Sequence, residues 1–420
     1  MTLRRYILQP PCLVLIAGCL TQSLLAQTAL TWNQVRARFE AANPTLRAGM
    51  INIDESRAAE ITAYLRPNPG ASFSLDQLQP FSVNPYQPLT GAFPLVSLNY
   101  LHERNHQREL RRDSAQAATA ISESQQADLL RTLVFSLRAA FVQTLQAKSI
   151  LALARENMDY FDRELVISRD RYKAGDIAQV DLNRLELQRV QYESDYQTAL
   201  VNLRTAKIQL LQLLGDRTPV DQFDVTGPFE FSEQVQPLEE LRALALDARP
   251  DLRAATQAVD KAKTDHRLAV ANGSTDPTFS FDAGHNPPYT GYIGFGVSIP
   301  LRFFDRNQGE KLRTQLDITR AERARDAAQN QVFADVESAY TTLLSTVSLL
   351  KPYKDKYLQV ARDVRDTIEF SYQHGQAALV DYLDAQRDYR ATYVNYLNLV
   401  ASYLTAAGQL NLAVGREVIQ

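Results

Sequence analysis

The stretch Tyr172-Lys-Ala-Gly175-Asp-Ile-Ala-Gln-Val180-Asp-Leu182 recurs 200 residues later as Tyr372-Gln-His-Gly375-Gln-Ala-Ala-Leu-Val380-Asp-Tyr382. In both copies the glycine follows one long helical pattern and precedes another. A glycine just after a helix commonly takes the left-handed conformation that ends it, so each copy predicts a sharp tip between two helices. Because equivalent positions of a repeat should have equivalent roles, the repeat guides the interpretation of every other motif.

The repeat extends well beyond the tips. At the same offset of 200, matching residues continue along the returning helices: Tyr196, Thr205, Ala206, Gln209, Leu210 and Gly215 recur as Tyr396, Thr405, Ala406, Gln409, Leu410 and Gly415. An earlier segment recurs at an offset of 206: Pro44, Leu46, Arg47, Ala48, Phe73, Ser74, Asp76 and Pro94 recur as Pro250, Leu252, Arg253, Ala254, Phe279, Ser280, Asp282 and Pro300. These matches predict a first repeat over 30–215 and a second repeat over 238–415. The segment between them, 216–237, is expected to be a linker or equatorial segment that carries one small strand or forms a clasp around the helices.

Very long helices dominate both repeats. A first helix is expected over 31–65, and no proline or glycine interrupts 105–172, which corresponds to roughly 100 Å of helix. In its counterpart over 308–372, Gly309 and Pro352 are the only glycine and the only proline. Apolar residues at alternating spacings of three and four, broken at Arg189 and Lys354, predict coiled-coil packing. The residues on this spacing are Phe333, Val336, Tyr340, Leu343, Val347, Leu350, Tyr357, Ala361, Val364 and Ile368, then Leu182, Leu185, Tyr192, Tyr196, Ala199, Leu203, Ala206, Leu210 and Leu213, with Tyr382, Ala385, Tyr389, Tyr396, Leu399, Tyr403, Ala406 and Leu410 in the twin helix.

Each repeat also predicts two strands, at about 71–80 and 91–100 and at about 277–286 and 291–301. In the last of these, large apolar residues such as Phe295 alternate with Gly294, Gly296 and Ser298. One apolar face and one small or polar face suits a strand between lipid and a wet lumen, although a strand on a soluble core is the alternative. Four strands cannot close a barrel of useful width, and open edges are not tolerated in lipid. The smallest consistent solution is an oligomer whose chains share one barrel, and three chains would give twelve strands.

Composition narrows the function. The chain of 420 residues carries 45 basic and 48 acidic residues, so nucleic acid is not an expected partner. No apolar run reaches the ~18 residues of a membrane-spanning helix, so a membrane crossing would use β-strands. Cys12 and Cys19 are the two cysteines of the chain, and the sequence after them can form neither a disulfide nor a thiolate metal site.

The first 29 residues resemble an export signal. Arg4 and Arg5 precede a short apolar stretch, and Ile16-Ala17-Gly18-Cys19 resembles a lipobox in which Cys19 would be lipidated. The alternative is ordinary cleavage near Ala26 or Ala29.

Taken together, these motifs resemble the TolC family of outer-membrane efflux proteins over nearly the whole chain after the signal. The resemblance rests on Asn43-Pro-Thr-Leu46, Arg249-Pro-Asp-Leu252 and the two tip motifs, the second of which continues to Gln386. The stretch from Ile299 to Gly309 is similar to the cobalt–zinc–cadmium resistance (CzcC-like) branch.

The resemblance implies a mainly α fold with a small membrane β-barrel. Each repeat would supply two long coiled-coil helices and two transmembrane strands to a homotrimer with a twelve-stranded barrel. Such a protein is not an enzyme and needs no cofactor or metal. It is a passive duct in the outer membrane of a Gram-negative bacterium, with a long periplasmic extension. An inner-membrane pump, of the RND type by resemblance, and a periplasmic adaptor deliver its substrates. A periplasmic coiled-coil scaffold without channel activity is the alternative.

The resemblance also assigns roles at the tips. Gly175 and Gly375 would mark the periplasmic mouth and the adaptor docking site, while Asp381 and Asp384 would project into the mouth as rings of charge. Tyr372 and Asp181 match positions that tie neighbouring tips by a hydrogen bond. Where the family often has a basic residue after the second glycine, this chain has Ala377, so a latch that depends on that cation does not carry over. A simpler reading makes the glycines helix caps and places Asp181 and Asp381 at positive helix ends.

One further motif carries a different chemistry. His102-Glu-Arg-Asn-His106 matches the HExxH zinc site of metallopeptidases. The other repeat has Phe304-Asp-Arg-Asn-Gln308 at the matching place, and a third ligand is also needed. Glu109 is too close along the chain and Glu123 is ~25 Å away along a straight helix. A chance match near a helix start is therefore the preferred interpretation.

Overall fold

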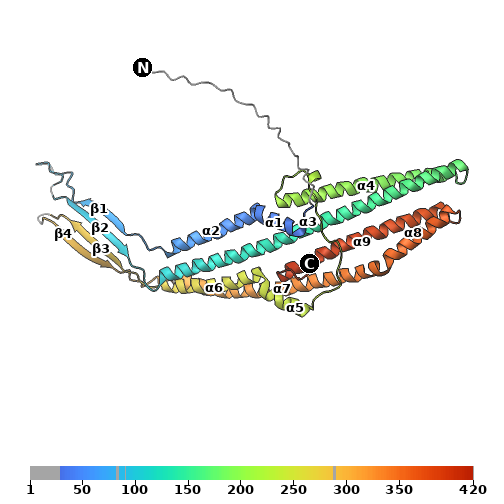
Figure 1. The fold of residues 1–420 in the computed structure, drawn as a ribbon. Coiled ribbons are helices and arrows are strands. Elements are labelled where there is room, and N and C mark those ends of the chain that lie inside the picture. The colour runs from blue at the N-terminus through green and yellow to red at the C-terminus, as the bar shows by residue number, and fades with distance from the viewer. Residues whose placement is uncertain (1–28, 82–84, 90, 287–289, 420) are drawn as a thin grey trace, which may run out of the picture.

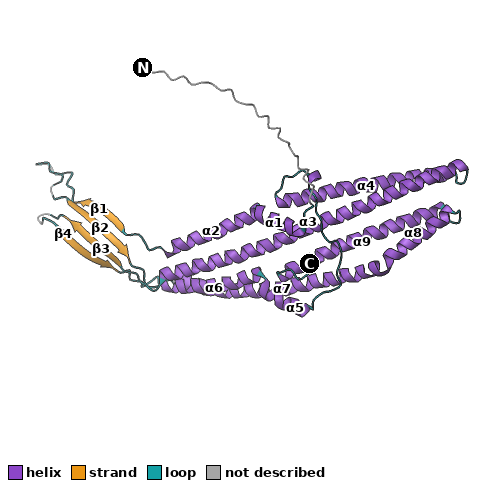
Figure 2. Ribbon diagram, in the orientation of Figure 1, coloured by secondary structure: helices purple, strands orange, loops and turns teal. Residues whose placement is uncertain are grey.

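The computed structural model describes residues 29–81, 85–89, 91–286 and 290–419. A small sheet lies at one end, two helical tips lie at the other, and long helices connect them (Figure 1). Helices make up most of this elongated molecule, and the strands are confined to its one end (Figure 2). Residues 1–28, which include most of the predicted signal and Cys19, lie outside the described residues.

The first repeat is built on α3, which spans Gln107–Ala174 and is 68 residues long, or roughly 100 Å. It runs without a break from the sheet to the first tip, and α4 (Gln179–Leu214) returns along it. A helix of this length is stable only with tertiary support, which α4, α2, α6 and α9 supply along its sides. Among the described residues, no helix is both long enough and apolar enough to cross a membrane.

The second repeat does not repeat this continuity. Here α7 (Gln308–Pro352) gives way to a π-helical segment (Tyr353–Tyr357), and α8 (Leu358–Gln373) follows before α9 (Leu379–Val414) returns. Proline has no amide hydrogen to donate and its ring crowds the preceding turn, so the helix rewinds locally at Pro352. The interruption expected at Pro352 in the helix over 308–372 therefore takes the form of a π segment.

The residues on the predicted coiled-coil spacing are buried or partly buried before the π segment and partly buried or exposed after it. Val336, Leu343 and Leu350 are fully buried, whereas Tyr357 and Val364 are about half exposed. The predicted break at Lys354 falls within the π segment itself. The wider π turn rotates the following residues about the helix axis, so the apolar spacing no longer faces the same neighbours.

Two shorter helices precede the sheet in each repeat: α1 (Trp32–Ala42) and α2 (Pro44–Tyr64), then α5 (Leu238–Ala248) and α6 (Pro250–Ala271). The prediction of one helix over 31–65 therefore needs correction, because the chain breaks before Pro44. A residue before proline disfavours the helical conformation. Asn43 and Arg249 are accordingly extended, with ψ of 121° and 120°.

These two residues anchor the ends of the returning helices. The Asn43 side-chain amide donates to the Leu213 carbonyl (3.4 Å), in the last turn of α4. The Arg249 guanidinium donates to the Ala413 carbonyl (3.3 Å), in the last turn of α9. Arg249 is buried and also binds Asp251 (2.6 Å) and Asp335 (2.7 Å). The same place in the two repeats thus holds a neutral anchor and a charged one.

The four strands β1 (Gly70–Asp76), β2 (Phe93–Leu101), β3 (Thr278–Gly284) and β4 (Tyr292–Ser298) form one antiparallel sheet in the order β1-β2-β3-β4. The two repeats meet at the β2–β3 pair, and β1 and β4 are the two edges. Two strands end earlier than predicted, since β1 stops at Asp76 rather than near 80 and β4 stops at Ser298 rather than near 301.

The register places most apolar side chains of the four strands on one face, whereas Phe93, Leu95, Leu101 and Tyr292 lie on the other. Directly paired residues lie on the same side of an antiparallel sheet, so the pairs can be followed from edge to edge. The resulting apolar set is Ala71, Phe73, Leu75, Pro94, Val96, Leu98, Tyr100, Phe279, Phe281, Ala283, Ile293, Phe295 and Val297. Phe295 is 81% exposed and Phe73 is 69% exposed, so this face has no cover within the chain.

The segment predicted as a linker, 216–237, crosses the helices as an extended strap (Figure 1). It contains one short 3-10 turn (Val220–Gln222), and Val225 pairs with Leu30 in an isolated parallel bridge. Phe231 packs against the ring of Tyr403 at 5.9 Å. The strap therefore contributes side chains to the cores of both repeats.

Candidate functional site at the helical tips

The first tip is closed by backbone geometry. Gly175 has a φ of 85°, a conformation that glycine adopts without strain. Its amide donates to the Tyr172 carbonyl (3.0 Å), and the Asp176 amide donates to the Arg171 carbonyl (2.9 Å). These bonds satisfy carbonyls that the end of α3 would leave free, and they reverse the chain into α4 within a few residues.

The second tip has the same backbone construction and a side-chain cap in addition. Gly375 has a φ of 71°, and the Gln376 amide donates to the Ser371 carbonyl (2.7 Å). The Asp381 carboxylate accepts from the Ala378 amide at 3.3 Å, which caps the start of α9. Asp181 lies in the matching first turn of α4. Both aspartates thus occupy helix ends where a negative charge is favoured.

Behind the tips, the two hairpins pack through an apolar and aromatic core. Tyr372 stacks on Tyr382 with ring centres 4.9 Å apart, and Phe161 stacks on Tyr192 at 4.5 Å. We name this group the tip cluster; its buried members are Phe161, Leu165, Leu182, Leu185, Tyr192, Tyr372, Leu379 and Tyr382. It joins α3 and α4 to α8 and α9, so it fixes the position of one tip relative to the other.

A layer of buried polar groups adjoins the tip cluster. Glu164 is 3% exposed and accepts one hydrogen bond, from the Gln373 side chain (3.2 Å). Several buried atoms of this layer have no hydrogen-bond partner among the described residues: Tyr160 Oη, Glu164 Oε1, Ser168 Oγ, Arg171 Nη1, Tyr372 Oη, Tyr382 Oη, Gln386 Nε2 and Arg390 Nε. Buried polar groups without partners cost free energy, so this contact between the hairpins is weaker than an apolar one of equal area.

The buried position changes the protonation of this layer. Burial raises the pKa of the Glu164 carboxyl, and the neighbouring Glu369 acts in the same direction, while the Gln373 hydrogen bond opposes them only in part. Burial also raises the pKa of the Tyr382 and Tyr372 hydroxyls, so both are neutral at physiological pH. A carboxyl and several phenols therefore share a poorly hydrated layer between the two hairpins.

The structure separates the predicted site residues into two groups. Asp381 and Asp384 are exposed on α9, where Asp384 forms an ion pair with Arg387 (3.1 Å) one turn further on. Tyr372, in contrast, is buried in the tip cluster, and its hydroxyl forms no hydrogen bond to Asp181 within this chain. The Asp181 carboxylate is nevertheless close enough to contribute to the raised pKa of Tyr372.

Ala377, noted from the sequence only for its lack of charge, packs against the tip cluster. Three other residues of the site were not identified from the sequence at all. Glu164, Ser168 and Gln386 gave no motif, although a glutamate between the buried Phe161 and Leu165 on one helical face is a signal that could have been used. A charged residue within an apolar helical stripe is unusual enough to mark a functional or strained position.

The HExxH motif does not have the geometry that its chemistry requires. His102–His106 precedes α3, and His106 takes a left-handed conformation (φ 56°) at its start. The two imidazoles are therefore not on one face of a helix. Glu103 forms an ion pair with Arg111, and His106 projects into solvent beside Glu109. No group of three or more metal-ligating side chains of the His, Cys, Asp or Glu type occurs in the described part of the chain.

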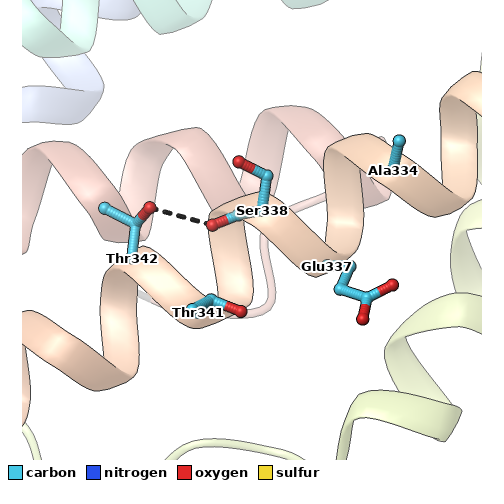
Figure 3. Close-up of a pocket in the computed structure, with 5 residues that line it drawn as sticks. All are labelled: Ala334, Glu337, Ser338, Thr341 and Thr342. Atoms are coloured by element: carbon cyan, nitrogen blue, oxygen red, sulfur yellow. Dashed lines mark hydrogen bonds between the residues drawn. The ribbon is translucent and has the colours of Figure 1, made fainter.

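A shallow depression on α7 offers no site either. Ala334, Glu337, Ser338, Thr341 and Thr342 line it, and all of them come from one helix (Figure 3). The hydrogen bond drawn there joins the Thr342 hydroxyl to the Ser338 carbonyl (2.8 Å), within the same helix. A binding site needs polar groups that converge from several elements, and this surface lacks them.

Comparison with known proteins finds similarity to one protein family. Residues 241–416 match the family model described as Outer membrane efflux protein. The chain is 22% identical over 307 residues to outer membrane protein TolC of Escherichia coli K12, a match that covers 67% of this chain and 62% of TolC. It is also 22% identical over 396 residues to the cobalt-zinc-cadmium resistance protein CzcC of Cupriavidus metallidurans, covering 92% of this chain and 90% of CzcC.

A solved structure supports the fold over nearly the full length. The crystal structure of CusC superimposes with a TM-score of 0.77, at 17% sequence identity, and the match covers 92% of each chain. The repeats, the order of helices and strands, the family model and the relatives therefore agree. Residues 241–416 thus match the outer membrane efflux protein family, and the chain as a whole has the fold of TolC-type channels.

Proposed function

We propose that three copies of this chain form a passive duct across the outer membrane, through which a tripartite export system releases its substrates. The observation that carries the proposal is the sheet, whose two edges are open and whose continuous apolar face is uncovered. Open edges leave backbone groups without partners, and an uncovered apolar face needs lipid or protein against it. Three sheets joined edge to edge into one closed sheet satisfy both requirements, with the apolar face toward lipid.

The helical layer supplies the rest of the duct. The helix α3 extends roughly 100 Å from the sheet. A layer of such helices around a common axis would continue the opening of the closed sheet into the periplasm and end at the tips. On this proposal the two repeats, 30–215 and 238–415, contribute equivalent parts of the wall, and the strap of 216–237 wraps it.

The tips would form the periplasmic mouth. Asp381 and Asp384 are exposed on one side of α9, so three copies would bring six carboxylates toward the axis. Like charges held close together repel each other and attract cations. The two aspartates are therefore proposed as a charged constriction, while Gly175 and Gly375 shape the surface that a periplasmic adaptor would bind.

The relatives support a proposal for the partners and the location. TolC and CzcC are named as an outer membrane protein and a metal-resistance protein, and CusC is described in connection with transmembrane channel formation. For this chain we propose a signal segment in 1–29, an outer-membrane location, an adaptor and an inner-membrane pump of the RND type. Identity is 22% to both TolC and CzcC, so it does not assign the cargo.

Single-channel recording on purified trimers in planar bilayers tests the proposal. Wild-type protein is expected to form stable pores, and the pair Asp381→Ala and Asp384→Ala is expected to lower their preference for cations. The matched control removes two exposed carboxylates far from the tips, by Asp54→Ala and Glu55→Ala on α2, and should leave conductance unchanged. Folded trimers that form no pore would instead support the periplasmic scaffold.

A further inference from the structure

One pair of strands within the sheet shows how the sheet could pair with that of a second copy. The β2–β3 pair joins the first repeat to the second, and a β4–β1 pair would join the second repeat of one copy to the first repeat of the next. If the repeats are equivalent, the two seams are equivalent as well. This inference rests on the proposed trimer and adds the register and the side-chain pairing of its seam.

The register of the sheet shows which residues correspond. Ser72 pairs with Ser97 in the first repeat, and Thr278 pairs with Ser298 in the second. Residues of β1 recur in β3 at an offset of 206, so Ser72 corresponds to Thr278. Their strand partners, Ser97 and Ser298, must then correspond as well, which sets the offset from β2 to β4 at 201. The residues that precede α3 and α7, His106 and Asn307, are left-handed and differ by the same 201.

This result corrects two equivalences expected from sequence. At an offset of 201, Pro94 corresponds to Phe295 rather than to Pro300, and His102 corresponds to Phe303 rather than to Phe304. The loops between the strands differ in length between the two repeats. A sequence match at one fixed offset therefore misaligns β2 with β4, whereas the backbone pairing shows which of their residues correspond.

The internal seam includes a specific polar pair. Ser97 lies directly opposite Asp282, and its hydroxyl donates to the carboxylate at 2.5 Å. The offsets convert Ser97 into Ser298 and Asp282 into Asp76, the same two residue types. Ser298 is the last residue of β4 and Asp76 is the last residue of β1, and each lies on an open edge.

We propose that Ser298 of one copy lies opposite Asp76 of the next and donates a hydrogen bond to it. The same register places Ile299 opposite Leu75, and Leu301 opposite Phe73. These four apolar side chains are all exposed in the single chain. Since a slip of one residue would move every side chain to the other face, the agreement of polar with polar and apolar with apolar supports this register.

Pro300 is compatible with the seam. In the internal seam, the His102 amide donates to the Pro277 carbonyl, so every second residue of β2 bonds to β3. Asn99, the equivalent of Pro300, therefore lies at a position that makes no backbone bond toward β3. Pro300 lies two residues beyond the end of β4, and a proline at this matching position leaves no missing bond in the new pair.

Disulfide cross-linking tests the pairing, since the other cysteines of the chain are at 12 and 19 and a Cys19→Ala background removes the later one. Residues opposite each other at a non-hydrogen-bonded position have Cβ atoms about 4.5–5.5 Å apart or closer, near the spacing that a disulfide needs. Full-length Ser298→Cys/Asp76→Cys protein is expected to give covalent trimers on non-reducing denaturing gels. Mixed single variants should give covalent dimers, because β1 and β4 are opposite edges of one chain.

Two matched variants complete the design. Ser97→Cys/Asp282→Cys should cross-link within one chain and leave its mass unchanged. Ser298→Cys/Ser74→Cys shifts the partner by two residues on the same face, where the spacing is about 7–8 Å, and should cross-link at least tenfold less. Equal or preferred cross-linking to position 74 would overturn the register. Native mass measurement separates this outcome from failure of the proposed function, since trimers without the 298–76 cross-link reject only the seam, whereas monomers reject the trimer.

Discussion

The two repeats share a backbone plan but differ in how they hold it. In the first, α3 continues unbroken to its tip and the neutral Asn43 anchors the end of α4. In the second, Pro352 introduces a π segment and the buried cation Arg249 anchors the end of α9. The first repeat therefore has one continuous long helix and a neutral anchor, while the second has a long helix interrupted by a π segment and a charged anchor. The comparison shows that a repeat can keep its geometry while its polar chemistry diverges.

Loss of the charged anchor should have the largest effect. Arg249→Ala is expected to lower the free energy of unfolding by about 3–5 kcal/mol, because Asp251 and Asp335 would remain as partly buried charges without their partner. Thermal unfolding of the detergent-solubilised protein, followed by circular dichroism, measures the change. Arg313→Ala removes an exposed ion pair with Glu310 and should leave the midpoint nearly unchanged. Equal effects of the two variants would contradict the anchor role.

The same anchor predicts a dependence on acid. Burial favours a higher pKa for Asp251, but its hydrogen bond to Arg249 and the charge of that residue outweigh burial, so the pKa is lowered. A lowered carboxyl pKa contributes stability at neutral pH that is lost as the pH falls toward the folded-state value. Arg249→Ala removes the interactions that lower this pKa, so the variant should lose less stability than the wild type as the pH falls. Unfolding midpoints recorded from pH 7 down to pH 3 should therefore converge, and parallel curves would argue against the assignment.

Adding a proline to the first repeat, or removing it from the second, should make the two repeats more alike. Ala152 lies 200 residues before Pro352 and is exposed on α3, so Ala152→Pro removes a backbone bond without removing packing. A proline inside a helix costs about 3 kcal/mol or more, so a clear loss of stability is expected. Pro352→Ala should restore a regular helix with no such loss. Hydrogen exchange of the amides in 353–357 measures it, and unchanged protection would show that neighbours rather than Pro352 impose the π segment.

The buried carboxyl between the hairpins should respond to pH in the opposite direction to the anchor. Because burial raises the pKa of Glu164, the folded state holds its proton more tightly, and this contribution is lost as the pH rises from the unfolded-state pKa through the folded-state value. Glu369, Arg171, Tyr160, Tyr372 and Tyr382 face the same layer. Glu164→Gln keeps the shape and the Gln373 contact, so it should stabilise the protein more at pH 8 than at pH 5. A constant difference in stability between Glu164→Gln and the wild type from pH 5 to pH 8 would reject the assignment.

The neutral anchor should give the smallest effect. Asn43→Ala removes a cap that accepts from the Thr45 and Leu46 amides, together with a long bond to Leu213. Loss of such a cap costs about 1 kcal/mol. Unfolding under the conditions used for Arg249→Ala places the two anchors on one scale. A cost for Asn43→Ala as large as that for Arg249→Ala would show that charge is not what separates the repeats.

Much of the fold could be predicted because it rests on local signals. Gly175 and Gly375 ended their helices as expected, and the alternation around Phe295 gave a strand in the expected place. The break at Pro44 was also available from the sequence, yet a continuous helical pattern obscured it. The polar layer around Glu164 was not predictable in the same way, because its members come from α3, α8 and α9 and meet only when the hairpins pack.

The sequence by itself determined the two repeats, their long helices, the glycine tips and the two-faced strands, since periodicity and backbone conformation depend on neighbouring residues. Only the tertiary structure decided that the β2–β3 pair joins the repeats, that its register carries Ser97 against Asp282, and that Arg249 reaches the end of α9. Those contacts join residues more than 150 positions apart, and their geometry depends on how whole helices and strands pack rather than on any local pattern.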